Sequence, residues 1–330
     1  AGPTTEIARN RLAELDVQRP VFAWVHYIDP HVPYHPPEEL AREFDPGYEG
    51  DYGLRFGYQP PPDEGLTGFE PFPPELPKDQ ASHRNPLSES VNAHIRRLYA
   101  AEIRAMDDEL EALVEMVRSL WPNTLIVFTA DHGESLGEHD FYFDHGDYAY
   151  NAASRVPLFF VLPPEHELRG SGRCDGWVSL VDVLPTVLEL LALPRPAALD
   201  RQIEGRSLME CFRGEPLPEV PVFVESGRAF FPELVTRRVR NDVEGRFRGV
   251  LQGRWKLIWT PFQTGDLEWE LYDVAADPDE TRDVHRPDHP AVADLSAELR
   301  TWMARARDTE SGATISEQDR EALRALGYLP

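Results

Sequence analysis

The first two thirds of the sequence alternate a helical pattern with short apolar runs. Between Ser88 and Pro122, apolar side chains recur every three or four positions, which predicts one long amphipathic helix. Three apolar and β-branched runs have the length of buried strands, and they cover residues 21–28, 124–130 and 156–162. This alternation predicts an α/β fold in which helices cover both faces of a sheet.

The last third of the chain carries shorter runs that are typical of an antiparallel sheet. The runs are VPVFVE, FRGVLQ, RWKLIWT and WELYDV, and Gln252–Gly253 predicts a turn between the middle two. Residues in RWKLIWT alternate, which predicts one packed face and places Lys256 on the solvated face. We therefore expect an α/β domain over residues 1–215, and a smaller unit with an antiparallel sheet and helices over residues 216–330.

A proline-rich insertion at about residues 30–86 interrupts this order. It holds 13 of the 31 prolines in the chain. This density predicts a segment without helices. A long irregular segment in a compact domain is either a cap over a functional site or a mobile excursion, and we favour the cap.

Composition and charge exclude several classes of function. The chain carries 33 basic and 58 acidic residues, a net charge of -25, which disfavours binding to nucleic acid or to an anionic membrane. No apolar run approaches the roughly 20 residues of a membrane span. The two cysteines, Cys174 and Cys211, allow at most one disulfide, and we expect two ordinary core thiols.

Polar side chains follow the first two apolar runs. The first run leads into Asp29-Pro30-His31, and the second leads into Asp131-His132. Paired carboxylate and imidazole donors suit Ca²⁺, Mn²⁺ or Zn²⁺. Alone, Asp131 would fit a polar turn equally well, with its carboxylate capping a backbone N–H. The similar ending of the first run favours a functional site at the carboxyl ends of the strands.

Several longer motifs resemble the sulfatase family of the alkaline-phosphatase superfamily. They are HYIDPHVPY (26–34), TADHGESLGEH (129–139), FDHGDYAYNAASRVPL (143–158), GRWKLIW (253–259) and ELYDVAADPDET (270–281). The resemblance covers nearly the whole chain. It implies an alkaline-phosphatase-like mixed sheet flanked by helices, with a smaller C-terminal antiparallel sheet and helices.

The resemblance also implies roles for individual residues. Asp131 and His132 match metal ligands, with calcium as the expected ion and manganese or zinc as alternatives. His31 matches the histidine that contacts the sulfate and its leaving-group oxygen, and His145 matches a position that grips the transferred group. The implied activity is hydrolysis of a small-molecule or carbohydrate sulfate ester. We expect His139 to make a supporting hydrogen bond, and the carboxylates of Glu134 and Glu138 to turn outward.

One part of the family pattern does not occur in this sequence. The family carries a Cys- or Ser-x-Pro-x-Arg signature whose first residue matures to a formylglycine nucleophile, and neither Cys174 nor Cys211 lies in such a motif. We expect the amino-terminal part of the pattern to be absent from this chain. A periplasmic or other extracytoplasmic location is expected only if that part carries a signal. A phosphodiesterase, a phosphoethanolamine transferase and a non-catalytic fragment stay open as alternatives.

Overall fold

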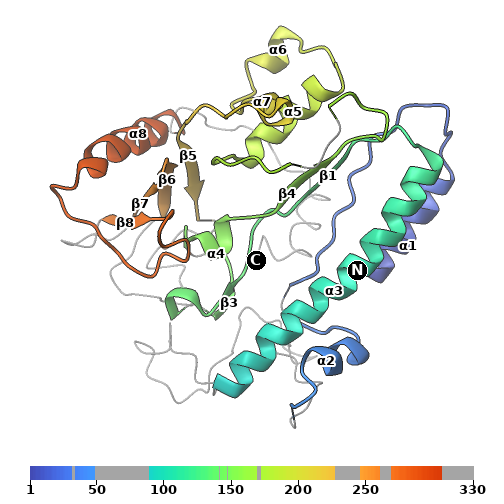
Figure 1. Cartoon of the computed structure of the whole chain (residues 1–330), viewed down its shortest axis with the longest axis horizontal. Coiled ribbons are helices and arrows are strands. Elements are labelled where there is room, and N and C mark those ends of the chain that lie inside the picture. The colour runs from blue at the N-terminus through green and yellow to red at the C-terminus, as the bar shows by residue number, and fades with distance from the viewer. Residues whose placement is uncertain are drawn as a thin grey trace, which may run out of the picture.

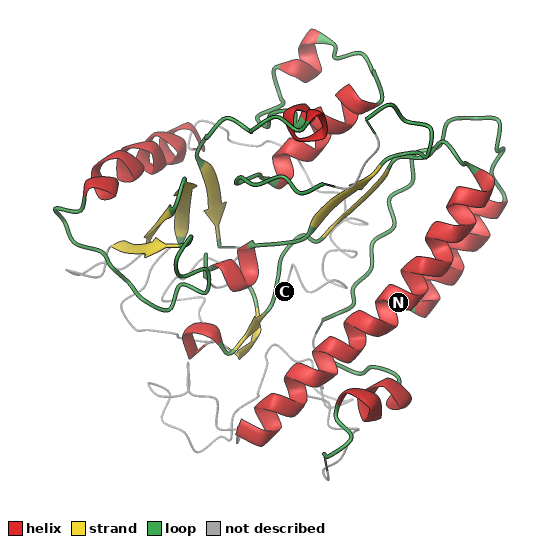
Figure 2. Cartoon of the chain, in the orientation of Figure 1, coloured by secondary structure: helices red, strands yellow, loops and turns green. Residues whose placement is uncertain are grey.

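A computed structural model describes most of the chain as an α/β structure (Figure 1). The described residues are 1–31, 34–48, 89–140, 142–146, 148–168, 172–226, 246–260 and 269–306. Figure 2 shows the strands lying between the long helix α3 on one side and α8 on the other. This arrangement agrees with the predicted alkaline-phosphatase-like α/β fold with a separate C-terminal antiparallel sheet.

Eight α-helices and two 3₁₀ helices occur within the described ranges. The helices are α1 (Gly2–Ala13), α2 (Glu38–Phe44), α3 (Glu89–Leu120), α4 (Asn151–Ser154), α5 (Val183–Leu190), α6 (Ala197–Asp200), α7 (Met209–Arg213) and α8 (Pro290–Ala306), with η1 (Glu138–Asp140) and η2 (Leu180–Asp182). Helix α3 confirms the long helix that the sequence predicts. In the described part of the chain, no helix is both long and apolar enough to cross a membrane.

The strands form three antiparallel groups within the described part of the chain. They are β1 (Ile126–Thr129) with β4 (Leu158–Val161), β2 (Ser135–Leu136) with β3 (Tyr142–Asp144), and the sheet of β5 (Val222–Glu225), β6 (Arg248–Gln252), β7 (Trp255–Trp259) and β8 (Trp269–Asp273). In Figure 1, the β1–β4 pair lies between α3 and the short helices α5 to α7. Two of the three predicted runs therefore form strands, but neither strand has a buried residue, and Phe159 of β4 is 58% exposed, so their predicted burial is wrong.

The first predicted run behaves differently. Residues 21–28 are extended but form no ladder with the described strands. Phe22 is 89% exposed and Trp24 is 83% exposed, so the prediction of a buried strand is wrong here. Apolar and β-branched composition favours an extended conformation, but it does not identify the strand that would pair with the run.

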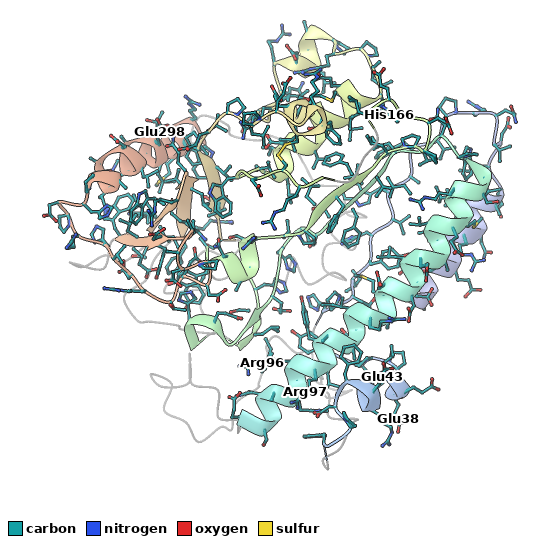
Figure 3. The ribbon with its side chains drawn as sticks, viewed as in Figure 1. Glu38, Glu43, Arg96, Arg97, His166 and Glu298 are labelled. Atoms are coloured by element: carbon teal, nitrogen blue, oxygen red, sulfur yellow. A yellow bond between two sulfur atoms is a disulfide. The ribbon has the colours of Figure 1, made fainter. Side chains whose placement is uncertain are left out.

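Helix α2 corrects the prediction of a helix-free proline-rich segment. Its sequence EELAREF contains no proline, and Pro37 stands at the N-cap, where a missing N–H costs little. Residues 49–88 of the insertion, including the predicted cap, lie outside the described residues. Figure 3 shows Glu38 and Glu43 of α2 near the end of α3 that carries Arg96 and Arg97. Arg97 Nη1 lies 3.0 Å from Asp45 Oδ1 and links the two helices.

The C-terminal sheet is packed on both faces. On one face, Leu257 and Leu271 pack against Leu295 and Leu299 of α8. The opposite face carries Ile258 and Tyr272, which pack with Ala149 and Phe247. Lys256 lies on this second face and is fully buried, so its predicted solvent exposure is wrong. Alternation along a strand separates two faces, but it does not show that both are covered. The boundary predicted at residues 215 and 216 stays a prediction.

The two cysteines also correct an expectation. Cys174 and Cys211 form a disulfide instead of two core thiols, and the bond joins the segment before Gly176 to helix α7. The cysteines are 37 residues apart, and their spacing alone gave no reason to pair them. The sequence also predicts a last helix that opens with the capping box Ser316-x-x-Asp319, and these residues lie outside the described part of the chain.

Candidate active site

The four predicted site residues lie in one cluster. The His132 and His145 rings stack with their centroids 3.7 Å apart, and the His31 ring meets His145 edge-on with a centroid distance of 5.3 Å. The Nε2 atom of His132 lies 3.6 Å from Oδ1 of Asp131. All four residues line a cavity of about 2810 Å³ between the 20–31 segment, α3 and the β1–β4 pair. Residues that are far apart in the sequence therefore share one concave site.

The loop after β1 is held against helix α4. The backbone N–H of Gly133 donates to the carbonyl of Ala153 at 2.7 Å. A Cβ atom at Gly133 would lie 2.3 Å from the Ala152 carbonyl oxygen, which is too close for any side chain. Glycine at this position therefore allows the close contact that places Asp131 and His132 at the cavity.

Asp131 and His132 present two donors that suit a hard or borderline cation. His132 Nδ1 lies 2.9 Å from the Gly133 carbonyl, which can only accept, so Nδ1 is the donor in this contact. The Nε2 atom faces the Asp131 carboxylate, whose side chain is 55% exposed. Within the described ranges, no group of three or more His, Cys, Asp or Glu side chains could hold a metal ion. The pair thus fits part of a metal-ligand set.

Glu134 supports His145 from inside the protein. Its side chain is only 3% exposed, and Oε1 lies 3.3 Å from His145 Nδ1, so the predicted outward orientation is wrong. The β2–β3 pairing explains this contact, because Ser135 lies opposite Asp144 and the next residue, His145, returns to Glu134. The Glu134 carboxylate also affects Tyr34: burial is the main cause that raises the pKa of the Tyr34 phenol, and the Glu134 charge is the second. A buried carboxylate at Nδ1 fixes the orientation of the imidazole.

Two other predicted residues have local contacts. The Glu138 carboxylate accepts a hydrogen bond from the Leu136 N–H at 2.6 Å, within its own turn. The His139 ring stacks on Tyr150 with a centroid distance of 3.6 Å. The supporting hydrogen bond of His139 stays a prediction.

Sequence reasoning missed Glu102, whose carboxylate lies behind His31. The side chain is on α3, is 6% exposed, and its Oε1 accepts a hydrogen bond from the His35 N–H. Burial is the main cause of a pKa of about 7 for Glu102; Asp29 also raises this pKa, while the backbone N–H groups of His35 and His31 lower it. Its position in the sequence could have indicated its burial, because Glu102 lies four residues after the buried Leu98 and therefore on the core face of the helix.

Two family models match this chain. The model described as Sulfatase matches residues 3–193, more than half of the sequence. The chain belongs to the sulfatase family. A second model, described as N-sulphoglucosamine sulphohydrolase, C-terminal, matches residues 137–309.

Curated relatives and solved structures agree with this family. The multifunctional alkaline phosphatase superfamily protein PehA of Trinickia caryophylli is 37% identical over 127 residues, which cover 37% of this sulfatase and 23% of PehA. An uncharacterized sulfatase of Schizosaccharomyces pombe is 22% identical over 94% of this chain and 61% of its own length. The chain thus spans less than two thirds of either relative.

A solved structure shows the same fold across most of the chain. It is described as BT4656 in complex with its substrate D-glucosamine-2-N,6-O-disulfate. The TM-score is 0.60 at 18% sequence identity, and the match covers 92% of this sulfatase and 68% of the other chain. At this identity the similarity establishes the fold.

Proposed function

We propose that this sulfatase hydrolyses a sulfate ester at the cluster of His31, Asp131, His132 and His145. The observation that carries the proposal is the convergence of three imidazoles and one carboxylate on one cavity. A sulfate ester presents anionic oxygens and a leaving alkoxide. Imidazoles can donate hydrogen bonds to the oxygens and a proton to the alkoxide, so the cluster suits both tasks.

His31 and His145 are the proposed catalytic residues. The Glu134 carboxylate beside Nδ1 fixes the orientation of the His145 ring, so that Nε2 is the ring atom left to contact a transferred sulfate group. His31, edge-on to His145, is placed to contact the same group and to protonate the leaving oxygen.

Asp131 and His132 would contribute two ligands to a divalent cation. Calcium is the ion that we propose, because the oxygen donor is hard; manganese and zinc also accept this pair. When bound, such an ion supplies positive charge for the sulfate oxygens. The contact of Nδ1 with the Gly133 carbonyl supports this role because it leaves Nε2, which lies 3.6 Å from Asp131 Oδ1, as the ring atom that could bind a cation.

The nucleophile is proposed to come from outside these 330 residues. The family nucleophile derives from a cysteine or serine in the Pro-Arg signature, and this sequence has no such motif. Both cysteines are also joined in a disulfide, so neither is available for conversion. A small-molecule or carbohydrate sulfate is the proposed substrate class, and the structural neighbour solved with a disulfated glucosamine supports the carbohydrate.

An esterase assay with matched variants tests this function. The chain is assayed alone and preceded by the amino-terminal segment of a full-length relative, with p-nitrophenyl sulfate as the probe. We expect His31→Ala and His145→Ala each to lower kcat/KM by about 100-fold or more. His285→Ala, in the loop between β8 and α8, is the control and should retain activity. Full activity in both site variants would refute the assignment.

Two further measurements separate the alternatives. Hydrolysis of bis(p-nitrophenyl) phosphate in preference to the sulfate would favour a phosphodiesterase. Calorimetry with Ca²⁺, Mn²⁺ and Zn²⁺ tests the metal site without any turnover. A non-catalytic fragment predicts no saturable binding that depends on His132, whereas the proposed site predicts binding that His132→Ala weakens.

A further inference from the structure

The carboxylate of Glu102 contacts the backbone of the segment that carries His31. Its Oε1 accepts from the His35 N–H, and the His31 N–H also donates to this carboxylate. Glu102 therefore contacts the backbone at both residue 31 and residue 35. Because α3 is a helix of 32 residues, the anchor is rigid.

The surroundings of Glu102 favour a specific role over general packing. The other carboxylate oxygen, Oε2, is buried and has no hydrogen-bond partner among the described residues. A carboxylate at such a position destabilises the fold unless its hydrogen bonds offset the burial. A leucine or methionine would fill the same face of α3 without this cost. Retaining a carboxylate here makes sense only through the two N–H groups that it fixes.

We propose that Glu102 is a positioning residue that fixes the His31 segment on α3 and so sets the distance from His31 to His145. Glu102 itself acts through the backbone and is not placed to contact substrate. His145 is oriented independently by Glu134, so the two proposed catalytic imidazoles are positioned by two different carboxylates. The catalytic consequence of this inference rests on the proposed function, whereas the structural consequence does not.

Three variants separate positioning from general stability. Glu102→Ala removes the acceptor. Glu102→Gln retains an oxygen at the same place and should restore the native arrangement. Glu115→Ala removes an exposed carboxylate from the same helix and serves as the control. Each variant is made in the full chain and compared with wild type.

Two measurements on the purified chain do not depend on enzymatic activity. Amide hydrogen exchange at His31 and His35 should rise about tenfold or more in Glu102→Ala, because each N–H loses its acceptor. In spectra of ¹⁵N-histidine-labelled protein, the His31 ring signals should move and those of His132 should stay. Glu102→Gln and Glu115→Ala should resemble wild type in both measurements.

Unchanged exchange at both amides in Glu102→Ala would overturn the proposal, and so would equal shifts at His31 and His132. If Glu102→Ala does not fold, Glu102→Asp replaces it, because a side chain one methylene shorter cannot reach both amides. Native exchange in Glu102→Asp would then overturn the proposal.

The effect of Glu102 on catalysis is measured with the p-nitrophenyl sulfate assay. Glu102→Ala should lower kcat by about 100-fold with a smaller effect on KM, since displacing a reacting group by 1 Å has this effect. Glu102→Gln should recover most of the loss. A wild-type protein without sulfatase activity would count against the proposed function but leave the exchange and NMR result intact, so the two failures are distinguishable.

Discussion

Lys256 and Glu280 form an ion pair inside the protein. Nζ of Lys256 lies 2.6 Å from Oε1 of Glu280, and the two side chains are 0% and 1% exposed. Nζ also donates to Asn151 Oδ1 at 3.0 Å, and Glu280 Oε2 accepts from the Asn151 N–H at 2.6 Å. Burial lowers the pKa of Lys256, and Glu280 opposes this shift. The triad joins strand β7, the loop after β8 and helix α4, which supports the loop of Gly133.

Removing one member of this pair should destabilise the fold strongly. We expect Glu280→Ala or Lys256→Ala to lower the free energy of unfolding by about 3–5 kcal/mol, because each leaves an uncompensated buried charge. Urea unfolding followed by circular dichroism measures the change. The double variant Lys256→Met/Glu280→Leu should recover much of the loss, since it removes both charges together.

An exposed pair provides the control for this prediction. Arg42 and Glu38 on α2 also form an ion pair, but their side chains are 60% and 67% exposed. Arg42→Ala should change the free energy of unfolding by less than about 1 kcal/mol. A Lys256→Ala variant as stable as Arg42→Ala would contradict the buried-pair interpretation.

Lys256 and Glu102 are buried charged residues, and the sequence pattern did not predict their burial. Lys256 was predicted on the solvated face because its neighbours alternate, and the helical pattern between Ser88 and Pro122 gave no partner for Glu102. Their partners lie far away along the chain: Asn151 is 105 positions from Lys256, and His35 is 67 positions from Glu102. Local periodicity reports the faces of an element, but it cannot report what a distant segment places against them.

The site motifs were more informative than the periodicity. Asp131, His132 and His31 follow apolar runs, His145 was identified only through the resemblance to sulfatases, and the structure brings all four together. The same runs did not predict strand pairing, since residues 21–28 form no ladder with the described strands. The polar residues at the end of an apolar run can be read from the sequence directly. Strand pairing depends instead on which other segments lie next to the run.

The disulfide should stabilise the protein by closing one loop of the chain, so that losing either cysteine removes the whole effect. Cys174 and Cys211 are 37 residues apart, and closing a loop of this size restricts the unfolded chain by about 4 kcal/mol. Cys174→Ser, Cys211→Ser and the double variant should therefore lose similar amounts of stability in urea unfolding. The losses should not add, because each variant removes the same bond.

Reduction is the control for the disulfide prediction. Dithiothreitol should lower the unfolding midpoint of the wild type towards that of the double serine variant, and it should leave the double variant unchanged. Additive losses from the two single variants would mean that packing of the side chains, and not loop closure, carries the stability.

A methyl group at Gly133 should displace the loop that carries the proposed metal ligands Asp131 and His132. The added Cβ in Gly133→Ala would lie 2.3 Å from the Ala152 carbonyl oxygen, so the backbone must move. We expect a loss of about 1–3 kcal/mol in the free energy of unfolding, as for other overpacked sites. Calcium affinity, measured by calorimetry, should fall by about 10-fold or more because Asp131 and His132 shift with the loop.

A second glycine provides the matched control. Gly47 has no atom within 4 Å of its ideal Cβ position, so Gly47→Ala should leave both stability and calcium affinity close to wild type. Native calcium affinity in Gly133→Ala would show that the loop adapts without moving its ligands.

Glu102 should make stability depend on pH near neutrality. Its pKa is about 7 in the folded protein against 4.5 for a solvated carboxyl, with Asp29, the Ala1 amine, Tyr34 and Tyr99 as the charged or titratable neighbours. Because folding raises this pKa, the protonated form stabilises the fold fully below pH 4.5, and about 3 kcal/mol is lost as pH rises through 7.

The variant Glu102→Gln provides the reference because its side chain does not titrate. The difference in unfolding free energy between wild type and Glu102→Gln, measured in urea from pH 4.5 to 8, should therefore shift against the wild type by this amount and level off above pH 7. A constant difference across this range would show that Glu102 is already ionised at low pH.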